Sequence, residues 1–308
     1  MTYDEWLQDF KLEAQNRGIQ PGILDAAFKD AVINEKVLEL DRKQPEKTET
    51  FKEYIEKRLT PKLPLAKGKL RTHSQDLRRV QKKYGVPANL IVALWGMETH
   101  FGKITGNFFI INALATLAFD SRRSDFFRNE LLEALKIVQN DKIPLDKLQG
   151  SWAGALGQTQ FMPSTYNNHA VDENEDGIKD IWDHHLDIFA SMANYLSNSG
   201  WKKDEPWGYE VELPAAFDES LISPVPHPVP DQRFIKRTTQ NWAEMGVHLK
   251  DGEVLPSNKL RGAIIRPDKG GAAFLVYDNF FVIFKWNRSF NFALTVLLFS
   301  NKIGNLNA

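Results

Sequence analysis

The first 85 residues alternate apolar and charged positions in a pattern typical of surface helices. Apolar side chains recur every three or four residues, as Trp6 and Phe10 do, with lysines and carboxylates between them. Residues at this spacing share one face of a helix, so the pattern predicts amphipathic helices. They are predicted over residues 3–18, 21–31, 50–59 and 73–85. Residues 40–48 predict an extended connector around Pro45.

After Pro87, which suits the first position of a helix, the helical pattern becomes more apolar. Helices are predicted over residues 88–102, 124–141 and 184–201, with Ser124 as an N-cap. Beyond Pro206, β-branched and aromatic residues gather between glycines and prolines, which favours strands. Strands are predicted within residues 206–214, 262–267, 270–286 and 292–300.

These elements predict a mainly α-helical protein in four parts. The predicted parts are an N-terminal helical domain (1–85), a helical core (86–205), a small β-containing domain (206–285) and a C-terminal return to the helical body (286–308).

Composition excludes several classes of function. The net charge of −1 gives no electrostatic footprint for nucleic acid. The absence of cysteine excludes disulfides, cysteine-ligated zinc and a lipobox cysteine on this chain. No run of 18 apolar residues predicts a membrane-spanning helix. Since the acidic start is unlike a signal peptide, we expect either a cytosolic protein or one whose leader is not part of this chain.

A single carboxylate stands in the apolar run of residues 89–103. On a helix, Glu98 shares a face with Leu94, Trp95 and Phe101. An apolar surrounding disfavours the charged form, so the pKa of Glu98 is expected to rise, as a general acid requires. The alternative is an ion pair at the edge of the apolar face with no role in chemistry.

Glycines and polar side chains follow between Gly150 and Tyr166. Glycine lets a backbone approach a ligand closely, and hydroxyl and amide side chains suit sugar hydroxyl and N-acetyl groups. The residues offering such groups are Ser151, Gln158, Thr159 and Gln160. This stretch predicts either a polar ligand groove or an ordinary connection between helices that stops at Pro163.

Residues 172–183 follow the twelve-residue calcium loop of EF-hands almost position by position. The predicted ligands are Asp172, Asn174, Asp176, the carbonyl of Ile178, Asp180 and Asp183. A glutamate usually fills the twelfth place, and the shorter Asp183 predicts weaker binding unless Asp187 closes a longer loop. A single loop without a paired partner favours a structural ion over a sensor. A solvated acidic turn is the alternative.

Together these stretches resemble the lytic murein transglycosylases of the MltB type, soluble and membrane-bound. The resemblance covers most of the chain. It rests on residues 40–46, 84–102, 121–127, 150–183 and 193–201, with a weaker match at 285–296. It implies a lysozyme-like helical core with a groove for glycan strands, flanked by a helical domain and a small β domain.

The resemblance also implies roles for individual residues. It places the sole catalytic acid and base on Glu98 and groove residues on Ser151, Gln160 and Tyr195. It places a cation site on the acidic loop, with Ca²⁺ or Na⁺ as its structural ion, and favours Asp187 over Asp183 because the family's loop is longer. No organic cofactor is implied.

Further groove residues follow from the same likeness. They are Arg122, Arg123, Phe126, Trp286, Phe292 and Tyr54. The arginines would meet peptide carboxylates or else lie on the surface at a helix start. Phe126, Trp286 and Phe292 replace family tyrosines, so stacking on sugars is retained while phenolic hydrogen bonds are lost.

The implied reaction is cleavage of peptidoglycan by one carboxylate without water. Glycosidases ordinarily use two carboxylates, and near Glu98 only Asp120 and Asp125 stand close, each placed like a helix-end residue. The second group would be the substrate's own N-acetyl carbonyl, and the product a 1,6-anhydromuramoyl end. We therefore expect a monomeric periplasmic enzyme acting on glycan strands, alone or within a cell-wall complex. An outer-membrane anchor on a removed leader is compatible with this. A hydrolytic muramidase and a non-catalytic calcium-stabilised glycan-binding protein are the alternatives.

Overall fold

A computed structural model describes residues 1–43, 49–120, 123–141, 143–223 and 234–306. The chain divides into two compact units, each built from two segments. Unit 1 comprises Met1–Lys47 and Trp95–Tyr195, and unit 2 comprises Thr48–Leu94 and Leu196–Ala308. The segments of the two units alternate along the sequence, so this division does not follow the four consecutive parts expected from the sequence.

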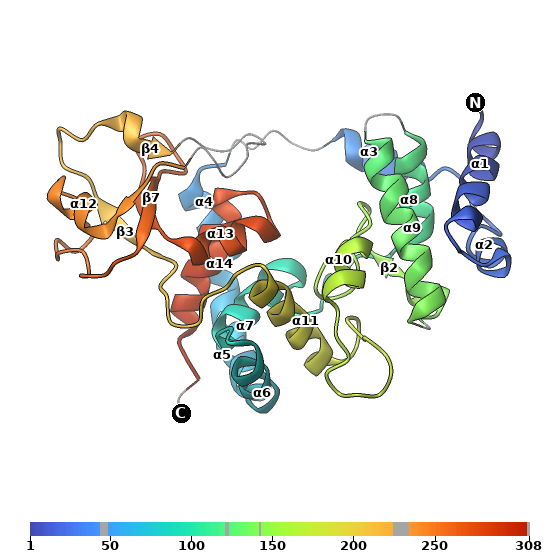
Figure 1. The fold of residues 1–308 in the computed structure, drawn as a ribbon, viewed down its shortest axis with the longest axis horizontal. Helices are drawn as coiled ribbons and strands as arrows, with labels where there is room; N and C mark the ends of the chain where they lie inside the picture. The colour runs from blue at the N-terminus through green and yellow to red at the C-terminus, as the bar shows by residue number, and fades with distance from the viewer. Residues whose placement is uncertain (44–48, 121–122, 142, 224–233, 307–308) are drawn as a thin grey trace. The chain divides into compact units, whose positions relative to one another are not determined.

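Unit 1 is helical. Its helices are α1 (Tyr3–Asn16), α2 (Pro21–Ala27), α3 (Glu35–Arg42), α8 (Ile110–Phe119), α9 (Ser124–Asn140), α10 (Pro163–His169) and most of α11 (His185–Asn198). The apolar helix α8 packs along α9 (Figure 1). Thr2 and Glu5 cap the start of α1 with reciprocal hydrogen bonds.

Unit 2 combines helices with a small sheet. The helices are α4 (Phe51–Arg58), α5 (Leu63–Thr72), α6 (Ser74–Tyr84), most of α7 (Ala88–Thr99), α12 (Thr239–Glu244), α13 (Asp278–Trp286) and α14 (Phe290–Ile303). Short 3-10 turns occur in both units, at Thr60–Lys62, Leu145–Lys147 and Glu219–Leu221. Near the start of α7, the side chain of Asn89 donates to the carbonyl of Ser300 at 3.0 Å, which ties α7 to α14 within the unit.

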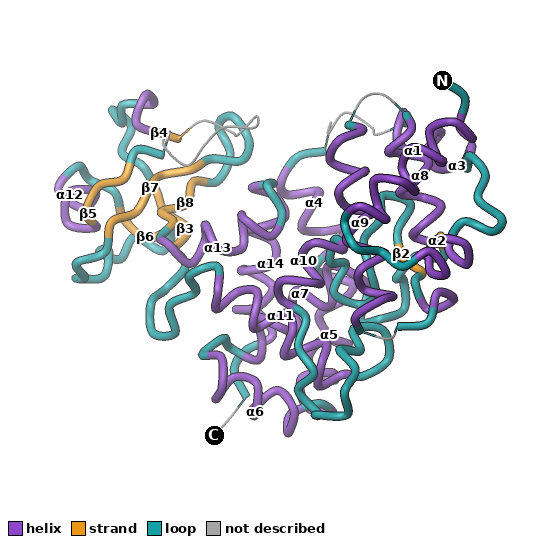
Figure 2. The backbone as a smooth tube through the Cα atoms, turned by 45° about the vertical axis from the view of Figure 1, so that its right-hand side comes forward, coloured by secondary structure: helices purple, strands orange, loops and turns teal. Residues whose placement is uncertain are grey.

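Six strands form the sheet of unit 2 in the order β4-β7-β8-β3-β6, with β5 also paired to β7. They are β3 (Gly208–Glu212), β4 (Ile222–Ser223), β5 (Lys236–Thr238), β6 (His248–Leu249), β7 (Arg261–Ile265) and β8 (Ala273–Val276), grouped in Figure 2. The pairs are antiparallel except β4 with β7. Fully buried Trp242 donates its indole N–H to the carbonyl of Gly262 at 2.9 Å, fixing α12 against the sheet.

Two predicted strands are in fact helices. Residues 278–286 form α13, although strand was predicted through residue 286, and residues 292–300 lie within α14. The prediction relied on aromatic and β-branched residues, which favour strands only weakly. Residues 279–284 and nearly all of residues 292–300 are buried, and a helix satisfies its own backbone hydrogen bonds in that setting. Tertiary packing therefore outweighed propensity.

Smaller differences lie at element ends. Residues 40–42 of the predicted connector end helix α3, and residues 44–48 lie outside the described residues. Ser124 is the first residue of α9, with Arg123 at the N-cap position and no side-chain cap. Among the described residues, no helix combines the length and hydropathy needed to cross a bilayer.

Candidate active site

Helix α7 carries Glu98 in its last turn, where the side chain is half-buried. One turn earlier, Trp95 is fully buried and packs edge-on against Phe101 and Phe189 at 5.5 and 5.2 Å between ring centroids. The helix ends sharply after Thr99. Glu98 is thus a half-buried residue one turn after the buried Trp95.

The backbone directly after Glu98 is strained. His100 and Phe101 adopt φ of 51° and 60°, and Gly102 follows at 83°. Side chains other than glycine rarely occupy this left-handed region, and such strain tends to concentrate at functional sites. The hydroxyl of Thr99 accepts from the N–H of Gly102 at 3.0 Å and holds this turn. This geometry favours a functional role for the end of α7.

Gln158 connects the end of α7 to the rest of unit 1. Its amide oxygen accepts from the indole N–H of Trp95 at 2.7 Å, and its amide nitrogen donates to the carbonyl of Trp182 at 2.6 Å. The backbone carbonyl of Gln158 accepts from the hydroxyl of Thr99 at 3.3 Å. Gln158 and Thr159 are both buried, so the sequence-based assignment of these two side chains as groove donors is wrong. The Gln158 side chain instead links Trp95 to the backbone of Trp182.

Ser151 and Gln160 keep hydrogen-bonding capacity at the surface. Both are half-buried. The Ser151 hydroxyl accepts from the N–H of Ala155 at 3.0 Å, which leaves its O–H without an acceptor within the described part of the chain. Gln160 has φ of 52° and donates both amide hydrogens to the carbonyls of Thr105 and Gly157, so its amide oxygen stays available there. One donor and one acceptor are thus open to a polar ligand.

Tight backbone packing holds this segment in place. Strands β1 (Phe108–Phe109) and β2 (Gln149–Gly150) pair antiparallel. A Cβ added to Gly150 would lie 1.9 Å from the carbonyl oxygen of Ala155. Two backbone segments therefore meet at a distance that only glycine allows.

Gly150→Ala is expected to lower the free energy of unfolding by about 1–3 kcal/mol, because the backbone of Ala155 must move to admit the methyl group. Urea denaturation would measure the change. Gly68→Ala is the control, since Gly68 lies within α5 with nothing within 4 Å of the added Cβ, and alanine there is expected to stabilise by about 0.5–1 kcal/mol. Equal effects of the two substitutions would contradict this packing argument.

Tyr195 lies on α11, half-buried against the same segment. Its ring centroid is 6.0 Å from that of Phe161 and 4.9 Å from that of His169. The neighbouring Asn194 donates to the carbonyl of His169 at 2.9 Å, which fixes α11 against α10. Unit 1 therefore brings together the end of α7, the segment containing Ser151 and Gln160, and the aromatic face of α11.

Comparison with protein-family models identifies the family of this chain. The model described as "Transglycosylase SLT domain" matches residues 2–301. The chain belongs to this family. Its fold is accordingly the lysozyme-like, mainly α-helical fold of the family's lytic transglycosylases, as the sequence predicted.

Relatives of known identity agree with this assignment. The membrane-bound lytic murein transglycosylase B of Escherichia coli K12 is 34% identical over 227 residues, which cover 73% of this chain and 59% of the relative. The chain thus spans less than two thirds of that protein's length. SltB3 of Pseudomonas aeruginosa, in complex with NAG-anhNAM-pentapeptide, has a TM-score of 0.91 at 39% identity, covering 99% of this chain and 80% of SltB3.

A third relative has been solved in complex with calcium. Slt35 of Escherichia coli in complex with calcium has a TM-score of 0.80 at 27% identity, covering 96% of this chain and 92% of Slt35.

In this chain the acidic loop of residues 172–183 turns at Gly177, with φ of 91°, and the side chain of Asp172 accepts from the N–H groups of Asp176 and Gly177. The acidic residues therefore organise the loop through its own backbone.

Asp187 is a fully buried carboxylate that contacts this loop. Its side chain is 0% exposed and accepts from the backbone N–H groups of Glu173, Asn174 and Asp180 at 2.9–3.2 Å. Burial raises the pKa of Asp187, and these hydrogen bonds offset the rise only in part. A nearby cation would favour its charged form. Asp187 therefore fits the position that closes a cation loop.

Asp180 and Asp183 face a different partner. The ammonium group of Lys147 lies 2.8 Å from a carboxylate oxygen of Asp183 and 3.4 Å from one of Asp180. In the part of the chain that the structure describes, no three acidic or histidine side chains converge as a metal site. The atoms that this loop could offer to a metal ion are oxygens, which suits Ca²⁺ chemically. A complete site would also need the side-chain amide oxygen of Asn174 and the backbone carbonyl of Ile178.

The remaining predicted groove residues lie in both units. In unit 1, Phe126 is 49% exposed, and Arg123 pairs at 2.8 Å with Asp41, which is 4% exposed. Arg122 lies outside the described residues. In unit 2, Tyr54 is covered on one face by the guanidinium of Arg58 at 3.9 Å, and Trp286 ends α13 half-buried.

Phe292 does not offer the stacking surface expected of it. Its side chain is 6% exposed within α14, so its ring packs in the core of unit 2. The motif around residues 285–296 suggested a sugar-binding aromatic, and the sequence contained no signal that this position faces inward, because α14 is apolar on nearly every side.

Proposed function

We propose that this protein is a peptidoglycan lytic transglycosylase that cleaves the β-1,4 bond between N-acetylmuramic acid and N-acetylglucosamine. The observation that carries the proposal is the family match over residues 2–301, within which Glu98 stands half-buried before a strained turn. Support comes from the structures of SltB3 of Pseudomonas aeruginosa in complex with NAG-anhNAM-pentapeptide and with NAG-NAM-pentapeptide.

In the proposed mechanism Glu98 is the sole acid and base. Its protonated carboxyl group donates a proton to the glycosidic oxygen as the bond to C1 of N-acetylmuramic acid breaks. The N-acetyl carbonyl of that sugar stabilises C1. The Glu98 carboxylate then removes the proton of the sugar's C6 hydroxyl, whose oxygen bonds to C1. Protons balance without water, and the product carries a 1,6-anhydro ring.

The groove residues position the glycan for this step. The free O–H of Ser151 and the free amide oxygen of Gln160 suit hydroxyl and N-acetyl groups of a sugar. In unit 1, Tyr195 and Phe126 offer aromatic faces for stacking, and Arg123, held by Asp41, offers a cation for stem-peptide carboxylates.

Digestion of purified cell-wall sacculi tests the reaction. We expect soluble muropeptides whose muramic ends are lighter by one water than reducing ends, as mass spectrometry resolves. Ends that retain the water would identify a hydrolytic muramidase. Binding of strands without release of any product would identify a non-catalytic glycan-binding protein.

The proposal includes a structural cation and a cellular setting. The cation ligands would be Asp172, Asn174, Asp176, the Ile178 carbonyl and Asp187, with Ca²⁺ favoured and Na⁺ as the alternative occupant. The proposed partner is peptidoglycan in the periplasm, acted on by a monomer that works alone or within a cell-wall complex.

A further inference from the structure

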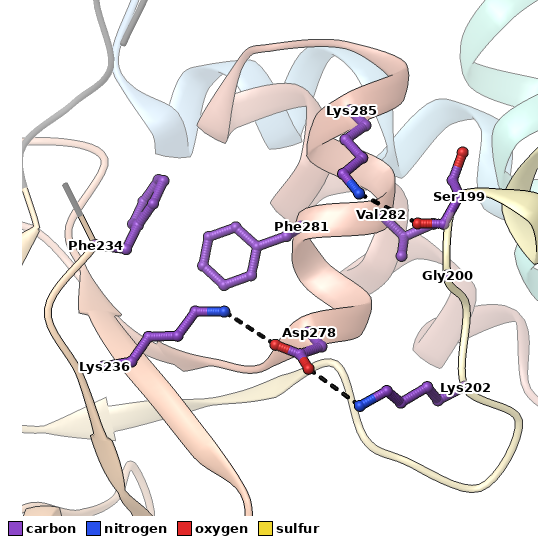
Figure 3. A pocket seen from close by; sticks show the side chains of 9 residues that line it. All are labelled: Ser199, Gly200, Lys202, Phe234, Lys236, Asp278, Phe281, Val282 and Lys285. Atoms are coloured by element: carbon purple, nitrogen blue, oxygen red, sulfur yellow. Dashed lines mark hydrogen bonds and ion pairs between the residues drawn. The ribbon is translucent and has the colours of Figure 1, made fainter. Parts of the chain in front are cut away.

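A cavity of about 270 Å³ lies within unit 2, apart from the residues assigned above to catalysis. Three lysines line it from three segments: Lys202 from the loop after α11, Lys236 from β5 and Lys285 from α13 (Figure 3). Phe234 and Phe281 supply apolar walls. Asp278, at the start of α13, is the acidic residue in this lining. The cavity lining therefore carries two more positive than negative charges.

Asp278 holds two of the lysines in place. Its carboxylate oxygens lie 2.9 Å from the ammonium group of Lys236 and 3.1 Å from that of Lys202. Burial raises the pKa of Asp278, but hydrogen bonds from both lysines outweigh it, so the pKa is lowered. Lys236 also lies 4.4 Å from the centre of the Phe281 ring, and Glu205 is 3.5 Å from Lys202. These contacts neutralise Lys202 and Lys236 in large part.

Lys285 is left without an anionic partner among the described residues. Its ammonium group donates to the backbone carbonyl of Ser199 at 3.3 Å, and its side chain is exposed at the cavity. Even if Glu205 is counted with Asp278, the three lysines exceed the carboxylates by one charge. An incoming anion would therefore complete the charge balance at Lys285.

Hydrogen bonds hold the wall of the cavity formed by α13 and the loop carrying Lys202. Asn279 is fully buried, and its side chain accepts from the N–H of Lys202 and donates to the carbonyls of Lys202 and Glu205, each at 2.8 Å. These hydrogen bonds attach the loop carrying Lys202 to α13. A preformed site loses less conformational entropy on binding than a flexible one.

We propose that this cavity binds a carboxylate group of a peptide stem attached to the glycan strand. The inference rests on the proposed function and adds a recognition site outside the groove residues named above. The ammonium group of Lys285 would pair with the carboxylate, while Phe234 and Phe281 would contact the aliphatic part of the stem. A neutral sugar would leave the charge of Lys285 unmatched, so the charge favours a peptide.

Calorimetric titration with two ligands tests the proposal. The ligands are the disaccharide in which C1 of N-acetylglucosamine is β-1,4-linked to N-acetylmuramic acid bearing a pentapeptide, and the same disaccharide with its lactyl carboxyl group blocked as a methyl amide in place of the peptide, so that it is neutral. Neither contains the scissile bond, so the intact protein can be used. The peptide-bearing ligand is expected to bind more tightly. Lys285→Gln is expected to weaken its binding about tenfold, the loss of one charged hydrogen bond, and to leave the peptide-free ligand unchanged.

Matched variants make the result specific. Lys259→Gln removes the same charge from an exposed lysine elsewhere in unit 2 and is expected to change neither affinity. Lys285→Arg is expected to retain most of the binding, and raised salt to weaken it. Equal weakening by Lys259→Gln, or equal weakening of both ligands by Lys285→Gln, would overturn the proposal. Inorganic phosphate is expected to compete with the peptide-bearing ligand for the unmodified protein but not for Lys285→Gln. This result would support a site for a carboxylate-sized anion at Lys285.

Failure of this inference is distinguishable from failure of the proposed function. If sacculi yield anhydro ends while Lys285→Gln leaves the peptide preference intact, the reaction stands and the stem site does not. If neither ligand binds and sacculi remain intact, the proposed function itself is wrong.

Discussion

Glu98→Gln is expected to reduce the rate of sacculus digestion by about 10²–10⁴-fold while leaving the fold unchanged. Glutamine preserves the size of the side chain and one of its two oxygens, but it can neither give up a proton to the leaving oxygen nor accept one from the C6 hydroxyl. Because Glu98 is half-buried at the end of α7 and does not belong to the fully buried core, a neutral isostere should be tolerated. Release of soluble muropeptides over time measures the rate.

The control for this variant is Glu212→Gln, which makes the same change at an exposed position of β3 in the other unit. Its digestion rate is expected to equal that of the unmodified protein. Circular dichroism and thermal unfolding of both variants would establish that they fold alike. A Glu98→Gln protein that digests sacculi at the normal rate would reject the assignment of Glu98 as the acid and base.

Asp187→Ala is expected to lower the free energy of unfolding by about 3 kcal/mol or more. The buried carboxylate accepts from three backbone N–H groups, and each buried donor left without an acceptor costs about 1–3 kcal/mol. Asp183→Ala is the matched control. Its side chain is 73% exposed and paired only with Lys147 at the surface, so its loss should cost under about 1 kcal/mol. Urea denaturation of both variants measures the difference.

Asp183→Ala and a second variant at position 187, Asp187→Asn, test which residue closes the cation loop. For the unmodified protein, added Ca²⁺ should raise the melting temperature and a chelator should lower it, since a ligand of the native state stabilises that state. Asp183→Ala should keep this response. Asp187→Asn, which retains one acceptor oxygen and folds with a smaller penalty, should lose it. A melting temperature that never responds to Ca²⁺ or chelator would show that the loop works without a cation.

Local pattern was sufficient to predict much of this protein. Helical spacing located α1, α6, α9 and α11, and the EF-hand-like spacing located the turn at Gly177. The placement of Glu98 on an apolar helix next to Trp95 was also predictable, because side chains four residues apart or fewer must lie near each other on one helix. These features depend on neighbours in the sequence alone.

Long-range packing decided what the pattern left open. Gln158 and Thr159 have the same polar character as Gln160, yet only contact with Trp95 and Trp182 determines that Gln158 is a buried connector. Likewise, burial rather than propensity made α13 a helix, and the cavity at Lys285 exists because segments distant in sequence meet there.

Sequence by itself therefore determined the family, the candidate acid and the acidic loop, since each is written in residue types at short spacing. Tertiary structure alone decided which polar side chains keep hydrogen-bonding groups near the surface and which carboxylate is buried beside the loop. Burial depends on contacts between segments far apart along the chain, and no local pattern encodes those contacts.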